Sequence, residues 1–207
     1  MGLLIDLMNR GGWVMYPLLL CSLAGLALVC ERLLALRRSR VVPRAFLVSA
    51  SQLLDRRLYN EVAFLCQEGE TAAARLVRLA LKMAGRSGAA FKSAMEEAGR
   101  RETVDLMRHL GALHLVASIS PLLGLLGTVS GMIAAFNSIA VEGIGSPGLL
   151  AGGISEALLT TAAGLCVAIP ALVAHRALLS RAATLSHDLE DLASDLMEAL
   201  TLPESRP

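Results

Sequence analysis

The chain has 207 residues, of which 55% are hydrophobic and only 3% aromatic, and its formal net charge is +1. A balanced charge of this kind gives no reason to expect nucleic acid as a partner. The apolar residues form a few long uncharged blocks, and a soluble domain of this length has too little interior to bury them. The composition therefore predicts a polytopic membrane protein with the lipid bilayer as its solvent.

The first block runs from Trp13 to Cys30 without a charge, which is just long enough to cross a hydrocarbon core. Its positive charges follow the apolar run instead of preceding it, and no small-residue cleavage site is present, so it does not resemble a secretory signal peptide. We therefore expect an uncleaved first span over 13–30, preceded by an external amino terminus over 1–12.

The second and third blocks are Gly111 to Val141, which has no charge unless His114 is protonated, and Gly143 to Ala174, in which Glu156 is the only charged residue. At about 30 residues each, they exceed one crossing, so each helix is expected to tilt or to extend beyond the membrane. The sequence VEGIGSPGLLAGG between them predicts a tight turn. We assign the spans to 111–141 and 152–175, joined by a turn at 142–151 into an antiparallel hairpin.

Basic residues give the orientation, because they concentrate on the cytoplasmic side of membrane proteins. They follow the first span, precede the second and follow the third, whereas the amino terminus offers only Arg10 and the hairpin turn none. The sequence therefore predicts an external amino terminus, a cytoplasmic segment at 31–110 and a cytoplasmic carboxyl-terminal helix and tail at 176–207.

The cytoplasmic segment is expected to be helical, with breaks near Gly69 and at Gly85 to Gly88. The sequence SAME, Ser93 to Glu96, predicts a capping box that opens the helix leading into the second span. Leucines at three-to-four spacing between Leu178 and Leu200, separated by acidic residues, predict an amphipathic helix after the third span. The fold class is therefore all-α.

Four cysteines lie far apart, without a CxxC pair and without histidines at metal-ligand spacing, so we expect free thiols, no metal and no cofactor. The histidines and serines form no recognisable catalytic constellation, and no enzyme activity is expected.

Small residues recur at three-to-four spacing along one stripe of each hairpin span. Such stripes let helix backbones approach closely in lipid, and this packing accounts for the glycines without any further function. At some positions the spacing fits either of two adjacent residues. The stripe of the second span comprises Ser120, Gly124, Gly127 or Thr128, Gly131, and Ala134 or Ala135; that of the third comprises Gly153, Ala157, Thr160 or Thr161, Gly164 and Ala168.

The polar residues of the hairpin are less easily explained by packing. Glu156 lies a short way into the third span, where an ionisable group is costly enough to be a functional candidate. The hydroxyls of Thr128, Thr160 and Thr161 either bond back to their own helices or serve a polar pathway. Pro121 and Pro170 each remove a helix hydrogen bond, which is either tolerated or used as a hinge.

The segments SPLLGLLGTVSGMIAAF and GISEALLTTAAGLCVAIPAL together resemble the signature hairpin of the MotA/TolQ/ExbB proton channel proteins. They are closer to the TolQ/ExbB branch, which includes ExbB-like biopolymer transport proteins, than to flagellar MotA. The ordered set of PLLGLLGTV, then GISEAL, then AIPAL is specific, whereas the rest of the chain agrees with the family in arrangement only.

The resemblance implies a homo-oligomer, a pentamer whose second and third helices line a pore around two single-span partner helices of the ExbD/TolR type. A partner aspartate carries the proton in that family. By motif position, Thr128 and Thr161 match the pore threonines, Glu156 matches the pore glutamate, and Pro121 and Pro170 match two prolines near the cytoplasmic half. Thr160, beside Thr161, is included in the expected pathway, and Gly124, Gly127, Gly131 and Gly164 are expected to pack the helices.

The implied function is that of a channel-forming subunit of a proton-driven motor in the bacterial inner membrane. It would transmit proton-motive force to a periplasmic partner of the TonB/TolA type for outer-membrane transport or maintenance. The chain is short for the branch, so the choice between a Ton and a Tol system stays open. The alternatives are a flagellar-stator-like ion channel subunit, for which a larger charged cytoplasmic domain is expected, and a passive membrane scaffold.

Overall fold

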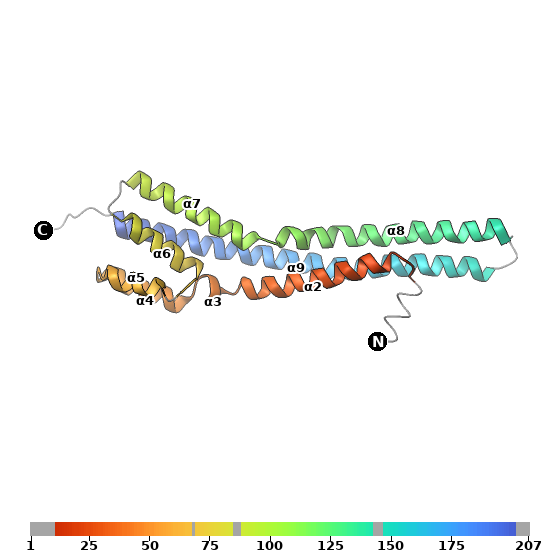
Figure 1. The fold of residues 1–207 in the computed structure, drawn as a ribbon, viewed down its shortest axis with the longest axis horizontal. Helices are drawn as coiled ribbons and strands as arrows, with labels where there is room; N and C mark the ends of the chain where they lie inside the picture. Colours follow the sequence, from red (N-terminus) through yellow and green to blue (C-terminus); the bar gives the residue numbers. More distant parts are fainter. Residues whose placement is uncertain (1–10, 68, 85–87, 143–146, 202–207) are drawn as a thin grey trace. The chain divides into compact units, whose positions relative to one another are not determined.

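The computed structural model describes residues 11–67, 69–84, 88–142 and 147–201, and every regular element in these ranges is an α-helix (Figure 1). The all-α prediction is confirmed. Three helical segments are long and apolar enough to cross a membrane. The helices are α2 (Met15–Ala35), α3 (Arg38–Val41), α4 (Arg44–Asp55), α5 (Tyr59–Gln67), α6 (Ala72–Met83), α7 (Gly88–Met107), α8 (Leu110–Glu142) and α9 (Pro147–Thr201).

The chain divides into two compact units, which we call the membrane unit and the helical unit. The membrane unit contains the described residues up to Glu31 together with His109–Ala177, and the helical unit contains Arg32–Arg108 and the described residues from Leu178 onward. The helix α9 contributes to both units without interruption. The sequence predicts a third span and an amphipathic helix that continues from it, and in the structure both belong to this single helix.

The membrane unit consists of α2, α8 and the first part of α9, and α8 and α9 run side by side as a hairpin (Figure 1). Large apolar side chains point outward on all three helices, including Leu20, Leu122 and Val173. In water this much exposed apolar surface would be costly, whereas in lipid it is the favourable arrangement. The outward-facing apolar side chains agree with the prediction that these helices cross a membrane.

The helix bounds can be compared with the expected spans, whose membrane limits stay a prediction. The helix α8 differs by one residue at each end from the expected span at 111–141, and α2 begins two residues later and ends five residues later than 13–30. Part of the expected turn, 143–146, lies outside the described residues, and α9 already begins at Pro147 within the expected turn. His109 separates α7 from α8 with a φ of 63°, a left-handed conformation that a continuing helix cannot contain.

The helical unit has a core built from amphipathic faces. The helix α6 buries small and aliphatic side chains, among them Leu76 and Val77, and α7 contributes Phe91 and Met95. The predicted break near Gly69 is confirmed, since α5 ends at Gln67 and α6 begins at Ala72. The amphipathic pattern after the third span is also confirmed, because its leucines line the buried face of α9: Leu178, Leu185, Leu189 and Leu196.

The capping box predicted at Ser93 to Glu96 is wrong. The helix α7 begins at Gly88, so Ser93 lies inside the helix, where Glu96 pairs with Lys92 instead. A different residue caps a helix in this unit. The hydroxyl of Thr71 accepts a hydrogen bond from the backbone N–H of Ala74 at 3.2 Å and thereby satisfies one of the free donors at the start of α6.

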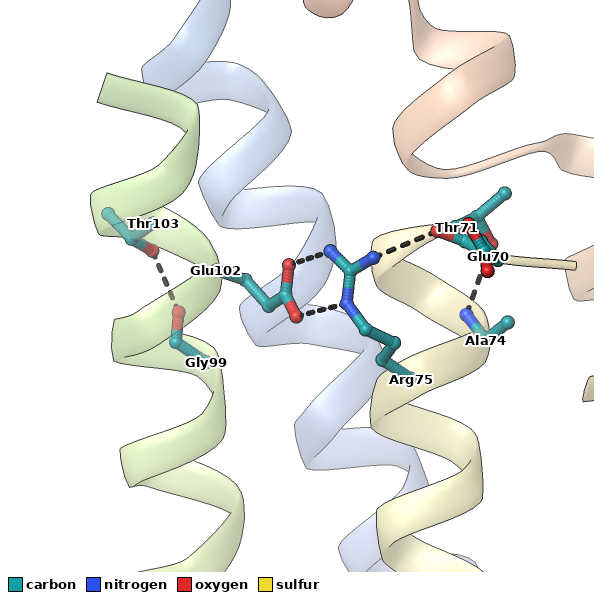
Figure 2. A network of polar contacts seen from close by, with 7 residues as sticks. All are labelled: Glu70, Thr71, Ala74, Arg75, Gly99, Glu102 and Thr103. Carbon is teal, nitrogen blue, oxygen red and sulfur yellow. Dashed lines mark hydrogen bonds and ion pairs between the residues drawn. The ribbon is translucent and has the colours of Figure 1, made fainter. Parts of the chain in front are cut away.

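Arg75 connects three segments of the helical unit (Figure 2). Its guanidinium donates two hydrogen bonds to the Glu102 carboxylate of α7, one of them from Nε at 2.7 Å, and a third to the carbonyl oxygen of Glu70 at 2.8 Å. The hydrogen bonds to Glu102 raise the pKa of Arg75. Nearby, Thr103 shares a 2.6 Å hydrogen bond with Ser186, which ties α7 to α9.

The four cysteines are free, as expected. Cys66 is fully buried in the helical unit, and this burial raises the pKa of its thiol. A raised pKa keeps the thiol protonated and poorly reactive at neutral pH, which agrees with a space-filling role.

Candidate functional site

The two stripes of small residues meet along the α8–α9 hairpin. Gly124 and Gly164 face each other, and a β-carbon on Gly164 would lie 2.6 Å from the carbonyl oxygen of Ser120 and 3.1 Å from Cα of Gly124. A β-carbon on Gly124 would lie 3.0 Å from the carbonyl oxygen of Thr160 and 3.1 Å from Cα of Thr161. The backbones are therefore so close that only glycine fits at these two positions.

The same contact continues toward the turn between α8 and α9. A β-carbon on Gly127 would overlap with the side chain of Thr160, and one on Gly131 would lie 3.2 Å from the carbonyl oxygen of Gly153. A β-carbon on Gly153 would lie 2.5 Å from the β-carbon of Ala135. Glycine pairs thus hold the two helices together over several turns.

The structure selects among the positions that the sequence left open. In the second span the contact uses Gly127 and Ala135, and in the third span it uses Thr160, which is 1% exposed. Thr128 and Thr161, one residue further along each helix, are only half-buried. They lie at the margin of the contact and are more exposed than Thr160.

The three threonine hydroxyls have different partners. Thr160 donates to the carbonyl oxygen of Ala157 at 2.8 Å and Thr128 to that of Leu125 at 2.7 Å, so both bond back to their own helix. Thr161 instead donates across the hairpin to the carbonyl oxygen of Gly124 at 3.2 Å. Only Thr161 among the three therefore couples α9 to α8 through a hydrogen bond.

Both prolines lie inside continuous helices. Pro121 interrupts the hydrogen-bond ladder of α8, and the preceding residue, Ser120, donates its hydroxyl to the carbonyl oxygen of Val116 at 2.7 Å. Pro170 lies within α9 and borders a cavity between α2, α8 and α9, whose lining also includes Gly25, Val116 and Cys166. A hinge at either proline stays a prediction.

Glu156 lies in the part of α9 near the turn of the hairpin and is half-buried. Its Oε1 atom occupies the position that a β-carbon on Gly12 would take, so the carboxylate packs against the backbone just before α2. The described part of the chain provides no hydrogen bond or ion pair to Glu156. Glu156 and the three threonines lie on the same hairpin, but they do not form one hydrogen-bonded cluster within a single chain.

Two features of the membrane unit were not foreseen. Nδ1 of His109 lies 2.9 Å from the Glu31 carboxylate at the end of the unit away from the hairpin turn. The rings of His114 and His175 face each other across α8 and α9, with centroids 5.0 Å apart. Each pair joins residues far apart in the sequence, so helical periodicity could not predict that they meet. The described residues contain no group of three potential metal ligands.

Comparison with known proteins bears directly on this hairpin. Residues 68–191 match the model of the MotA/TolQ/ExbB proton channel family. The chain belongs to this family. Its membership confirms the resemblance found in the hairpin motifs and extends it to α6 and α7, where the motifs gave no signal. The chain is therefore a member of a membrane channel and transport family.

Three relatives carry ExbB names. A putative biopolymer transport protein ExbB-like 1 from Synechocystis is 37% identical over 86% of this chain and 71% of the relative. The ExbB-like 3 protein from the same organism is 34% identical over 79% of each chain. The biopolymer transport protein exbB1 of Vibrio cholerae is 33% identical over 81% of this chain and 75% of the relative. These relatives support an ExbB/TolQ-type role.

Proposed function

We propose that the chain is the channel-forming subunit of a proton-driven motor in the inner membrane. In this proposal it assembles as a pentamer around a single-span partner of the ExbD/TolR type and drives a periplasmic transducer of the TonB/TolA type. Family membership and the ExbB names of its relatives support this role. The flagellar-stator alternative has no comparable support among these three relatives.

The observation that carries the pore assignment is the position of Thr161. Its hydroxyl lies at the margin of the packed stripe, whereas its neighbour Thr160 is enclosed by Gly127 and its own helix. We therefore propose that Thr161 and Thr128 border the proton pathway. For Thr160 the structure supports packing instead of a direct role in the pathway.

A neutral hydroxyl orders water but does not hold a proton at working pH, so the pathway needs a carboxylate. Glu156 is the only one within the expected spans. Because it lies near the outer end of the hairpin, we assign it to the entrance of the pathway. The main relay carboxylate then comes from the partner, as the family resemblance implies.

Assembly tests this proposal against a passive scaffold. Native mass spectrometry of the complex, extracted together with its single-span partner, is expected to show five copies of this chain. The physical reason is that the outward apolar faces of α2, α8 and α9 can satisfy further neighbours besides lipid. A preparation that contains only monomers, with the partner in the same membranes, contradicts the proposed pore.

Topology provides an independent test. In a variant without native cysteines, Gly148→Cys near the hairpin turn is expected to react with a membrane-impermeant maleimide added from outside, and Gly88→Cys at the start of α7 is expected to react only after lysis. Both positions are exposed and have open space where a side chain would be added. The distribution of basic residues predicts that α7 lies on the cytoplasmic side. The reverse labelling pattern contradicts the orientation.

A further inference from the structure

The amino-terminal end of α2 contacts both hairpin helices at one level. The indole Nε1 of Trp13 donates to the hydroxyl of Ser130 on α8 at 3.4 Å, and Gly12 packs against the Glu156 carboxylate of α9. These two contacts use adjacent residues and reach different helices. We call Gly12, Trp13, Ser130 and Glu156 the outer clasp.

Gly12 is suited to this contact for two separate reasons. Its φ of 66° is in the left-handed region, which glycine adopts without strain. It also leaves the space of a β-carbon free, and Oε1 of Glu156 occupies that space. Any other residue at position 12 would therefore displace the carboxylate, the backbone or both.

The clasp also lies at a particular depth in the membrane. In each of the three segments about 20 residues, or about 30 Å, separate it from polar or charged residues at the other end of the membrane unit, which matches one hydrocarbon thickness. These distances run from Trp13 to Glu31, from Ser130 to His109 and from Glu156 to Arg176. Trp13 is 60% exposed, and tryptophan is enriched where membrane meets water. The clasp thus lies at the outer boundary, with the tip of the hairpin beyond it.

The Glu156 carboxylate is half-buried, and the described residues hold it by packing without a hydrogen bond or ion pair. The adjoining start of α2 also presents the positive end of the helix dipole, which favours a nearby carboxylate. The position of the carboxylate therefore depends on the shape of the Gly12 backbone.

We propose that Gly12 and Trp13 are positioning residues, which hold the Glu156 carboxylate at the outer entrance of the proton pathway. This inference rests on the proposed function for its role in proton entry, but the clasp itself does not depend on that function. Gly12 sets the space for the carboxylate, and Trp13 fixes the start of α2 against α8.

The test combines two readouts on the complete complex in liposomes. Trp13 is the only tryptophan of the chain, so intrinsic fluorescence of this chain reports on the clasp without reference to proton movement. The partner is used in a form without tryptophan. Proton flux under an imposed membrane potential, measured over a range of external pH, reports on function. The variants are Gly12→Ala, the double variant Gly12→Ala with Glu156→Asp, and Gly152→Ala as a matched control in open space on α9.

Gly12→Ala is expected to increase quenching of Trp13 by acrylamide, to lower proton flux by about tenfold and to change its dependence on external pH. Aspartate is shorter by one methylene, so the double variant is expected to recover part of both signals relative to Gly12→Ala. Gly152→Ala should match the parent chain.

The inference is overturned if Gly12→Ala behaves like Gly152→Ala. It is also overturned if adding Glu156→Asp to Gly12→Ala restores neither the quenching nor the flux, because backbone strain alone then explains the loss. Altered quenching with unchanged flux and an unchanged pH profile also overturns it. If the parent complex conducts no protons at all, the proposed function fails, and the fluorescence series alone decides whether the clasp exists.

Discussion

Thr161→Val is expected to reduce proton-driven transport by about tenfold or more, which corresponds to roughly 1.4 kcal/mol on the limiting barrier. Valine keeps the branched shape and removes the hydroxyl, so water and proton carriers at the margin of the hairpin lose a donor and acceptor. The lost hydrogen bond to Gly124 is a single bond between membrane helices, which contributes only about 0.6 kcal/mol on average. The complex should therefore still assemble.

Two variants make this experiment specific. Thr161→Ser keeps the hydroxyl and should retain most of the transport, whereas Thr160→Val changes a threonine that is enclosed in the helix contact and should cause a smaller loss than Thr161→Val. Thr128→Ala and Glu156→Ala are expected to resemble Thr161→Val. Transport is measured as energised uptake in cells, normalised to the amount of assembled complex. Parent rates in Thr161→Val, Thr128→Ala and Glu156→Ala together contradict the pore assignment and favour a scaffold.

Gly164→Ala is expected to destabilise the hairpin, although alanine is ordinarily the better helix former. In an open helical position, glycine to alanine gains up to about 1 kcal/mol. At Gly164 the new β-carbon lies 2.6 Å from the carbonyl oxygen of Ser120, so the helices must separate, and such overpacking costs about 1–3 kcal/mol.

The control for this prediction is Gly152→Ala, on the same helix with no neighbour within 4 Å of the added carbon. Gly152→Ala should raise the free energy of unfolding above that of the parent chain, and Gly164→Ala should lower it. The two variants should differ from each other by about 2 kcal/mol. Unfolding of the purified protein by a denaturing detergent, followed by circular dichroism, measures the difference. Equal stability of the two variants contradicts the close backbone contact between α8 and α9.

Much of this fold was accessible from the sequence because the lipid solvent imposes strong rules. Long uncharged blocks located α2, α8 and α9, and small residues at helical spacing identified the faces that meet. The sequence did not reveal which of two neighbouring residues on a helix faces the other helix. Gly127 and Thr128 are neighbours that fit the same spacing almost equally well, and so are Thr160 and Thr161. Only the angle between two packed helices decides which neighbour faces inward.

Contacts between distant segments escaped the sequence altogether. Nothing in the spacing relates Gly12 to Glu156, Trp13 to Ser130, or His114 to His175, because each contact arises from how three helices pack. The capping box failed for a different reason. Its letters fit the motif, but the helix already began at Gly88, and a local motif does not reveal whether a helix precedes it.

Proton flux measured in liposomes tests whether this chain and its single-span partner together form a proton channel. The chain is reconstituted with its single-span partner, a membrane potential is imposed with potassium and valinomycin, and the internal pH is followed with a trapped dye. We expect a flux that requires both proteins and falls by about tenfold or more in Thr161→Val. An assembled complex that conducts no more protons than liposomes without protein would contradict it.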